Sequence, residues 1–230
     1  SLPDATWTCG VQQPAPFKRQ MWKQFDPDSA EKFSRYSLLI SCAVPRPIAL
    51  VTSLDTNGVR NCAPFSYFGV VSHDPPLLSV TVCTQGRDRT QKDTLNNITA
   101  TNQFVVNIMS EWFVESANHT CGAFPPDVDE ITVSGLSAVP SVKVKPPRVA
   151  ESAVQLECQV YNIQPIYNDA QEHTSSIVYG RIVNFHVHEE VLSESGLTAD
   201  INKLKPISRA GGDTYVTVGQ TFDLKRPKVF

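Results

Sequence analysis

Charged and hydroxyl side chains are concentrated in one segment, QGRDRTQKDT, residues 85–94. The segment holds Arg87, Arg89, Lys92 and Thr94, with Asp88 and Asp93 between them. It lies between an expected strand and an expected helix, and the first N–H groups of a helix lack partners and carry the positive end of its dipole. With the cations, these groups would bind a phosphate. The alternative is a solvated helix start with local ion pairs, since the two aspartates dilute the positive charge.

A second candidate is the hairpin PRPIALVTSLDTNGVRNCAPFSYF, residues 45–68. Asn57-Gly58 can supply the positive φ angles of a tight turn, so the flanking strands should pair. We expect the pairing to fail at Pro64, because proline lacks an N–H and is tolerated only at a sheet edge or bulge. The backbone groups released there need another partner if they are buried. A planar heterocycle with donors and acceptors along one edge would serve, and the alternative is an ordinary edge strand whose spare groups meet water.

Two further patterns are weaker. His186 and His188 would point the same way from a strand and could form half a metal site. No Cys or carboxylate spacing completes such a site, so we expect no metal and interpret both as strand surface. None of the 11 glycines forms G-x-G-x-x-G or a P-loop. The segment GLSAV, residues 135–139, lacks the closing glycine of a nucleophile elbow, which argues against a serine hydrolase.

The elements that position these residues are mainly strands. From Pro47 onward both alternating faces are nearly apolar, as in a strand covered on each side. Further strands are predicted at 77–84, 103–109, 156–166, 176–188 and 215–218, and helices at 92–100 and 201–204. Asp26-Pro27 would begin an amphipathic helix that contains Phe33, Tyr36 and Ile40. Proline-rich residues 122–149 are expected as loop, and the near absence of crossover helices favours a closed or Greek-key barrel over a parallel sheet.

Composition limits the class of protein. A chain of 230 residues with 41% hydrophobic content supports one substantial core. A net charge of −3 gives no global positive field for nucleic acid or anionic lipid. No apolar stretch reaches the roughly 20 residues of a membrane span, so we expect no membrane association. The six cysteines are widely spread without a C-x-x-C pair, which favours a reducing, cytoplasmic location.

Several motifs occur together in a fixed order. They are PRPIALVTS (45–53), NCAPFSYF (61–68), DPPL (74–77), KDTLNNI (92–98), FVVNI (104–108), GL (135–136), PRVAE (147–151), LEC (156–158), GRIV (180–183) and RAGG (209–212). In this order they closely resemble the flavin reductase-like, flavoredoxin-type family of FMN-binding split barrels, over residues 35–218. The resemblance implies a mainly β fold, a six-stranded Greek-key split β-barrel with a few peripheral helices. It places an N-terminal arm at 1–30, the FMN-binding domain at 31–218 and a C-terminal tail at 219–230.

The resemblance also assigns cofactor-binding residues. Those expected beside the isoalloxazine and the ribityl chain are Thr52, Ser53, Asn61, Ala63, Pro64, Phe65 and Ser66. Those expected at the phosphate end are Arg89, Lys92, Asp93 and Thr94, with Lys92 as charge partner and Thr94 as hydroxyl donor. The family implies a homodimer with FMN at or near the interface, and the arm or the tail could cover the partner subunit.

The activity implied is NAD(P)H-dependent hydride transfer to FMN, which is expected in preference to FAD. The reduced flavin would be used in place or delivered to a partner monooxygenase. Because the flavin performs the chemistry, no acid or base is required, and no catalytic residue is assigned. His119 and Tyr215 are weaker candidates for lining the nicotinamide face. The alternatives are an FMN-holding oxidoreductase that acts directly on a specific organic substrate, and a non-catalytic flavin-binding electron carrier.

Overall fold

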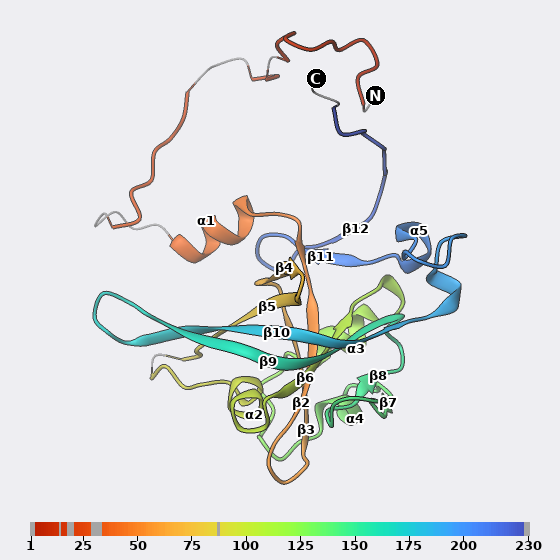
Figure 1. The fold of residues 1–230 in the computed structure, drawn as a ribbon. Helices are drawn as coiled ribbons and strands as arrows, with labels where there is room; N and C mark the ends of the chain where they lie inside the picture. The colour runs from red at the N-terminus through yellow and green to blue at the C-terminus, as the bar shows by residue number, and fades with distance from the viewer. Residues whose placement is uncertain (1–2, 14, 18–20, 29–33, 87, 228–230) are drawn as a thin grey trace.

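The alternating apolar segments form one large antiparallel sheet in the computed structural model, which describes residues 3–13, 15–17, 21–28, 34–86 and 88–227. The sheet has seven strands in the order β3-β2-β6-β9-β10-β5-β4 (Figure 1). Their bounds are β2 (Ala49–Leu54), β3 (Arg60–Phe65), β4 (Phe68–His73), β5 (Pro76–Cys83), β6 (Gln103–Ile108), β9 (Val154–Tyr167) and β10 (His173–Val187). The prediction of a mainly β fold is therefore confirmed.

Smaller elements surround this sheet. One small sheet joins β1 (Arg46–Pro47), β11 (Ile207–Arg209) and β12 (Tyr215–Thr217), and another joins β7 (Ala138–Val139) and β8 (Arg148–Val149). The helices are α1 (Arg35–Cys42), α2 (Asp93–Thr101), α3 (Val114–His119), α4 (Glu130–Val133) and α5 (Ile201–Leu204), with short 3₁₀ turns η1 (Glu111–Phe113) and η2 (Glu189–Val191). In the part of the chain described, no helix is long and apolar enough to span a bilayer.

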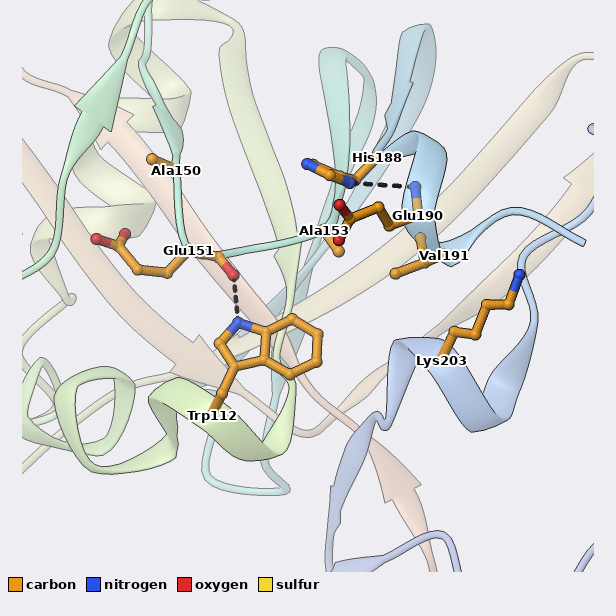
Figure 2. A pocket seen from close by; sticks show the side chains of 8 residues that line it. All are labelled: Trp112, Ala150, Glu151, Ala153, His188, Glu190, Val191 and Lys203. Carbon is orange, nitrogen blue, oxygen red and sulfur yellow. Dashed lines mark hydrogen bonds between the residues drawn. The ribbon is translucent and has the colours of Figure 1, made fainter.

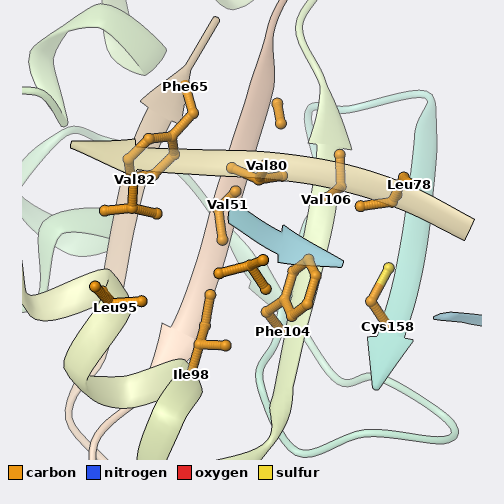
Figure 3. Packing of buried hydrophobic residues seen from close by; sticks show 12 residues of the cluster. Val51, Phe65, Leu78, Val80, Val82, Leu95, Ile98, Phe104, Val106 and Cys158 are labelled. Atoms are coloured by element: carbon orange, nitrogen blue, oxygen red, sulfur yellow. The ribbon is translucent and has the colours of Figure 1, made fainter. Parts of the chain in front are cut away.

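Strand β2 is buried on both faces, as its sequence predicts. Ala49 and Val51 belong to one core cluster, which Figure 3 shows packed with Phe104, Val80 and Ile98. The alternate residues Ile48 and Leu50 belong to a second cluster, which also contains Phe113 and Ile131. Because side chains alternate along a strand, one β2 strand contributes to both cores and is held firmly from each side.

Several boundaries differ from the sequence prediction. The segment NCAPFSYF contains the end of β3 and the start of β4, with a break at Ser66 and Tyr67, so the large sheet has seven strands. Helix α1 begins at Arg35, and its cap is Ser34, whose side chain accepts from the Ser37 N–H. Asp26 therefore does not begin a described helix, and Phe33 lies outside the described residues. The sequence pattern also missed η1 and α3, which are too short for a clear period.

The pairing of the hairpin does not fail at Pro64, which corrects the sequence prediction. The β2–β3 register runs without a shift from Leu54 opposite Arg60 to Ala49 opposite Phe65, with Pro64 opposite Leu50. β3 is an edge strand, and Cys62, two residues before Pro64, directs its N–H away from β2, toward Glu130. Pro64 has the same parity, so its nitrogen also faces the open edge and no ladder bond is lost.

One buried carboxylate holds part of the loop-rich region 122–149. Glu157 on β9 is fully buried and accepts hydrogen bonds from the N–H groups of Val142, Lys143 and Val144, at 2.5–3.0 Å. His186 on β10 lies 2.5 Å from the same carboxylate. Burial would raise the pKa of Glu157, but these hydrogen bonds outweigh it and lower the pKa to about 2. The loop is therefore tied to the sheet by an ionised group.

The described parts of residues 3–28 contain no helix or strand. Figure 1 shows this segment as an extended trace that lies clear of the large sheet. Its side chains Phe17, Met21 and Trp22 are 73–78% exposed in the single chain. Such exposure of large apolar side chains is typical of segments that contact another molecule.

Candidate functional site

A cavity of about 170 Å³ lies where the edge strand β3 meets the start of α2. Its walls combine both segments that the sequence singled out with the turn after α3 and with α4. The lining residues are Asn61, Ala63, Pro64, Gln85, Lys92, Asp93, Thr94, Thr120, Cys121, Gly122, Ala123, Phe124 and Glu130. Residues about 30 positions apart in the sequence thus line one cavity.

The helix start supplies the positive end of this cavity. Lys92 is the N-cap of α2, and its side chain makes no capping hydrogen bond. Its Nζ lies 5.7 Å from the centre of the Phe65 ring, a cation–π distance that leaves the ammonium donors available. Asp93 and Thr94 follow in the first turn, where backbone N–H groups favour an anion. This end of the cavity suits a phosphate.

A hydrogen-bond network holds the wall formed by β3. The carboxamide oxygen of Asn61 accepts from Thr94 Oγ1 at 2.7 Å and from Ser53 Oγ at 3.3 Å. Ser53 is fully buried and also accepts from Asn97 Nδ2 at 3.2 Å. Ser53 therefore supports Asn61 from behind and is not itself among the residues that line the cavity.

Sequence reasoning missed Glu130, which closes the other side of Asn61. Its Oε2 accepts from Asn61 Nδ2 at 2.7 Å and from the Cys62 N–H at 2.5 Å. Burial, with a smaller contribution from the nearby carboxylates Asp93 and Asp129, raises the pKa of Glu130 to about 7 against the lowering effect of the Cys62 N–H. A lone Glu in a loop-rich segment gives no sequence signal, because its partners lie 68 and 69 positions away.

A second hollow, of about 190 Å³, adjoins the first and shares Pro64 and Cys121 with it. Its other lining residues are Tyr36, Ile48, Ser66, Asn118, Arg209 and Tyr215. The guanidinium of Arg209 lies 4.4 Å from the centre of the Tyr215 ring, and the Tyr215 hydroxyl donates to Asn118 Oδ1 at 2.7 Å. Two adjoining hollows, one of which contains Lys92 at a helix start, suit an elongated ligand that carries a terminal phosphate.

Arg46, which sequence reasoning also missed, holds this second hollow together. Its guanidinium donates to the carbonyls of Ile40, Ala43 and Ala210 at 2.5–3.0 Å and to Ser66 Oγ at 3.4 Å. One side chain thus joins the end of α1, the segment after β11 and the end of β3. The sequence around Arg46, an arginine between two prolines, does not predict these hydrogen-bond partners.

Besides Ser53, three of the expected site residues do not line either hollow. Thr52 is fully buried and donates to the Pro147 carbonyl at 2.5 Å. Phe65 is 7% exposed and packs in the core, where it touches the site only through Lys92. Arg89 is exposed, has a φ of 58°, and lies 3.4 Å from Glu172 Oε2. Arg87 lies outside the described residues.

Four residues were weaker candidates: His119, Tyr215, His186 and His188. His119 is exposed and packs edge-on against Phe124, whereas Tyr215 does reach the second hollow. His186 contacts Glu157, and His188 Nδ1 accepts from the Glu190 N–H as the cap of η2. Within the described ranges, no group of three His, Cys, Asp or Glu side chains is arranged to hold a metal.

A larger hollow, of about 440 Å³, contains none of the predicted residues (Figure 2). It lies between Trp112, Glu151, His188 and Lys203, and the Trp112 indole donates to the Glu151 carbonyl at 2.8 Å. Its charged groups have both signs and do not converge on one point. We therefore place the candidate site in the smaller cavities, where a helix start, a cation and a hydrogen-bonded wall converge.

Comparison with known proteins gives consistent matches. The family described as "Flavin reductase like domain" matches residues 41–206. The structure of nitrilotriacetate monooxygenase component B from Bacillus cereus is 33% identical, with a TM-score of 0.84, over 90% of this chain and 100% of that one. The structure of 2-nitrobenzoate 2-nitroreductase NbaA from Pseudomonas fluorescens is 32% identical, with a TM-score of 0.72, over 84% and 90%.

A third structure shows the fold alone. It is a split barrel domain protein from Shewanella frigidimarina, 21% identical with a TM-score of 0.73, over 84% of this chain and 92% of that one. The large antiparallel sheet described above is therefore a split barrel, as the motif order predicted.

Proposed function

The chain belongs to the flavin reductase-like domain family, and from this premise we propose that it binds FMN in the two joined hollows and transfers hydride to it from NADH or NADPH. The observation that carries the proposal is the convergence of Lys92, Thr94 and the free edge of β3 on one cavity. A terminal phosphate monoester fits the α2 start, which favours FMN over FAD, whose phosphates are both internal. The bound flavin would supply the redox chemistry.

The residues of the chain bind and orient the cofactor. Lys92 would pair with the phosphate, and Thr94 and Asn61 would border the polyol chain. Pro64 and Ser66 would face the ring system in the second hollow, where Arg209 and Tyr215 form the far wall. Within this arrangement no described side chain is needed as proton donor or acceptor. The protein would bind the flavin and exclude water from it.

Purified protein tests the proposal when it is mixed with NADH or NADPH and excess FMN. We expect oxidation of the nicotinamide, followed at 340 nm, above the rate without protein. A titration of FMN followed by flavin fluorescence should show saturable binding. A protein that neither takes up FMN nor accelerates the oxidation would refute the proposal.

A second candidate follows from the similarity to a nitroreductase. In that case the flavin stays bound and reduces an organic substrate directly. The discriminating measurement is the oxidation of NADH or NADPH with stoichiometric FMN, with and without a nitroaromatic acid. Acceleration by the acid favours direct reduction, whereas dependence on excess free FMN favours a flavin reductase. Uptake of FMN without any nicotinamide oxidation would favour an electron carrier.

Partners belong to the same proposal. We propose a homodimer with the flavin near its interface, since Phe17, Met21 and Trp22 of the arm are 73–78% exposed in the single chain. We also propose delivery of reduced flavin to a monooxygenase, because the similar Bacillus cereus protein is a component of one.

A further inference from the structure

Glu130 stands at the meeting point of three elements of the candidate site. It begins α4, lines the cavity with Lys92, Asp93 and Thr94, and is only 8% exposed. Among the described residues, the hydrogen bonds to its carboxylate end on one oxygen, Oε2. The cavity wall therefore contains a carboxylate, although the adjoining helix start is suited to an anion.

The hydrogen bonds of Glu130 fix the orientation of Asn61. Because the carboxamide nitrogen donates to Glu130, the carboxamide oxygen is turned toward Thr94 Oγ1. The second bond, from the Cys62 N–H, satisfies the open edge of β3 two residues before Pro64. A single carboxylate thus sets the position of the β3 wall and, through Asn61, of the Thr94 hydroxyl.

Charged groups lie near this carboxylate on α2, on β3 and just before α4. Asp93 and Lys92 line the same cavity from the start of α2, and Asp129, the N-cap of α4, forms an ion pair with Arg60 of β3. Burial and the charge of Glu130 raise the pKa of the Cys62 thiol, so that thiol stays protonated. Burial raises the pKa of Glu130 itself to about 7, so this carboxyl changes charge around neutrality.

We propose that Glu130 is a positioning residue whose charge sets how tightly the cavity holds a phosphate-bearing flavin. In its neutral form it keeps β3 and Asn61 in place without repelling the phosphate. In its charged form it repels the phosphate. This inference rests on the proposed function, and it states how the charge of Glu130 controls the affinity of the same site.

The direction of the pH effect follows from the coupling between proton binding and FMN binding. A phosphate dianion near Glu130 would raise the pKa of this carboxyl above its value in the free protein, so binding takes up a proton. Affinity for FMN should then fall as the pH rises through 7 and above. The phosphate itself ionises with a pKa of about 6, which acts in the opposite direction, so the range from pH 6.8 to 8.8 isolates the carboxyl.

Fluorescence titrations of the full chain with FMN and with riboflavin test this inference. For FMN the Kd should rise about three- to tenfold from pH 6.8 to 8.8, the range that one coupled charge gives. Riboflavin, which lacks the phosphate, should show little change. Glu130→Gln should remove the pH dependence for FMN, because a carboxamide oxygen still accepts from Cys62 and Asn61 but carries no charge. Glu130→Ala should weaken both ligands at every pH.

Asp129→Asn is the matched control, since it also replaces a carboxylate by a carboxamide, one position earlier. Asn is, like Asp, a good helix cap. This variant should keep a pH dependence for FMN, displaced toward lower pH, because the Asp129 carboxylate, besides burial, raises the pKa of Glu130. FMN binding with a flat pH profile in the wild type, or an unchanged profile in Glu130→Gln, would overturn this inference and leave the proposed function standing. Absence of FMN binding at every pH would overturn both. The comparison of FMN with riboflavin uses the wild type alone. It therefore tests the pH dependence even where a substitution prevents folding.

Discussion

At the scale of single residues, Lys92 carries the clearest expectation. Among the described residues that line the 170 Å³ cavity, it is the one Lys or Arg side chain. Lys92→Met keeps most of the stem that packs near Phe65 and removes the ammonium. We expect FMN to bind about 1.5–3 kcal/mol more weakly, the range of charge-assisted hydrogen bonds. Fluorescence titration with FMN measures the change.

Two comparisons make the Lys92 prediction specific. Riboflavin should bind Lys92→Met nearly as it binds the wild type, because it carries no phosphate. Lys145→Met, which changes an exposed lysine that is not part of this lining, should leave FMN affinity unaltered. Unchanged FMN affinity in Lys92→Met would place the phosphate elsewhere.

Glu157 carries a prediction about stability and pH. Its folded pKa of about 2 lies below the usual 4.5, so its contribution is complete above pH 4.5 and is lost as the pH falls toward 2. Glu157→Gln should lower the free energy of unfolding by about 2–3 kcal/mol at pH 7, because charge-assisted bonds to three N–H groups are weakened. The difference from the wild type should shrink between pH 4.5 and 2.5.

Urea unfolding at several pH values measures this effect. Glu172→Gln is the control, since Glu172 is an exposed glutamate, and its effect should stay within about 0.5 kcal/mol. A difference between Glu157→Gln and the wild type that stays constant down to pH 2.5 would contradict the role assigned to the ionised carboxylate.

At the scale of elements, the packing of β10 near β6 depends on the glycine at position 180, which has no side chain. A Cβ on Gly180 would lie 3.1 Å from Phe104 Cε1, closer still to Cζ, and 3.3 Å from Cys158 Cβ. Phe104 is fully buried, so it has little room to move. Gly180→Ala should therefore destabilise the protein by about 1–3 kcal/mol, the usual cost of overpacking, although alanine is the better strand residue.

A double-mutant cycle tests that packing. Phe104→Leu should itself be destabilising, and in its presence Gly180→Ala should cost less than in the wild type. Gly69→Ala is the matched control on β4, where a Cβ would meet no atom within 4 Å, and its effect should be small. Additive effects of Gly180→Ala and Phe104→Leu in chemical unfolding would show that the two positions do not compete for space.

At the scale of the whole molecule, the exposed arm bears on assembly. Phe17 and Trp22 are 73% and 78% exposed on a segment that lies clear of the sheet (Figure 1). If the arm covers a second copy, the double substitution Phe17→Ser and Trp22→Ser should raise the dimer dissociation constant at least about tenfold, since each buried aromatic contributes a few kcal/mol. Light scattering over a dilution series measures this constant.

Leu197→Ser is the control for that experiment. Leu197 is 87% exposed and lies in the loop between η2 and α5, far from the arm in sequence. Its substitution should leave the dimer unchanged. Equal dimer constants for the wild type and the double arm variant would mean that the arm does not contribute to the interface.

The sequence determined the class of fold and half of the site. The two apolar faces of β2, and runs rich in Val, Ile, Tyr and Phe for β5, β6, β9 and β10, located these strands to within a few residues, because such side chains pack well on a sheet that faces a core. The helix start with Lys92, Asp93 and Thr94 was also located, since the start of a helix is a local feature that neighbouring residues specify. The hairpin that contains Pro64 was located through the turn at Asn57-Gly58, which is equally local, whereas Asn61 was assigned only through the resemblance of motifs.

Only the tertiary structure decided which polar groups meet. Glu130 reaches Asn61 across 69 positions, Arg46 reaches Ala210 across 164, and Thr52 turns inward to Pro147 across 95. Local pattern cannot specify such pairs, because they depend on the order in which strands assemble in the sheet. The same order made β3 an edge, so that Pro64 sits in an unbroken ladder while its neighbours on β3 bind Glu130 and line the cavity.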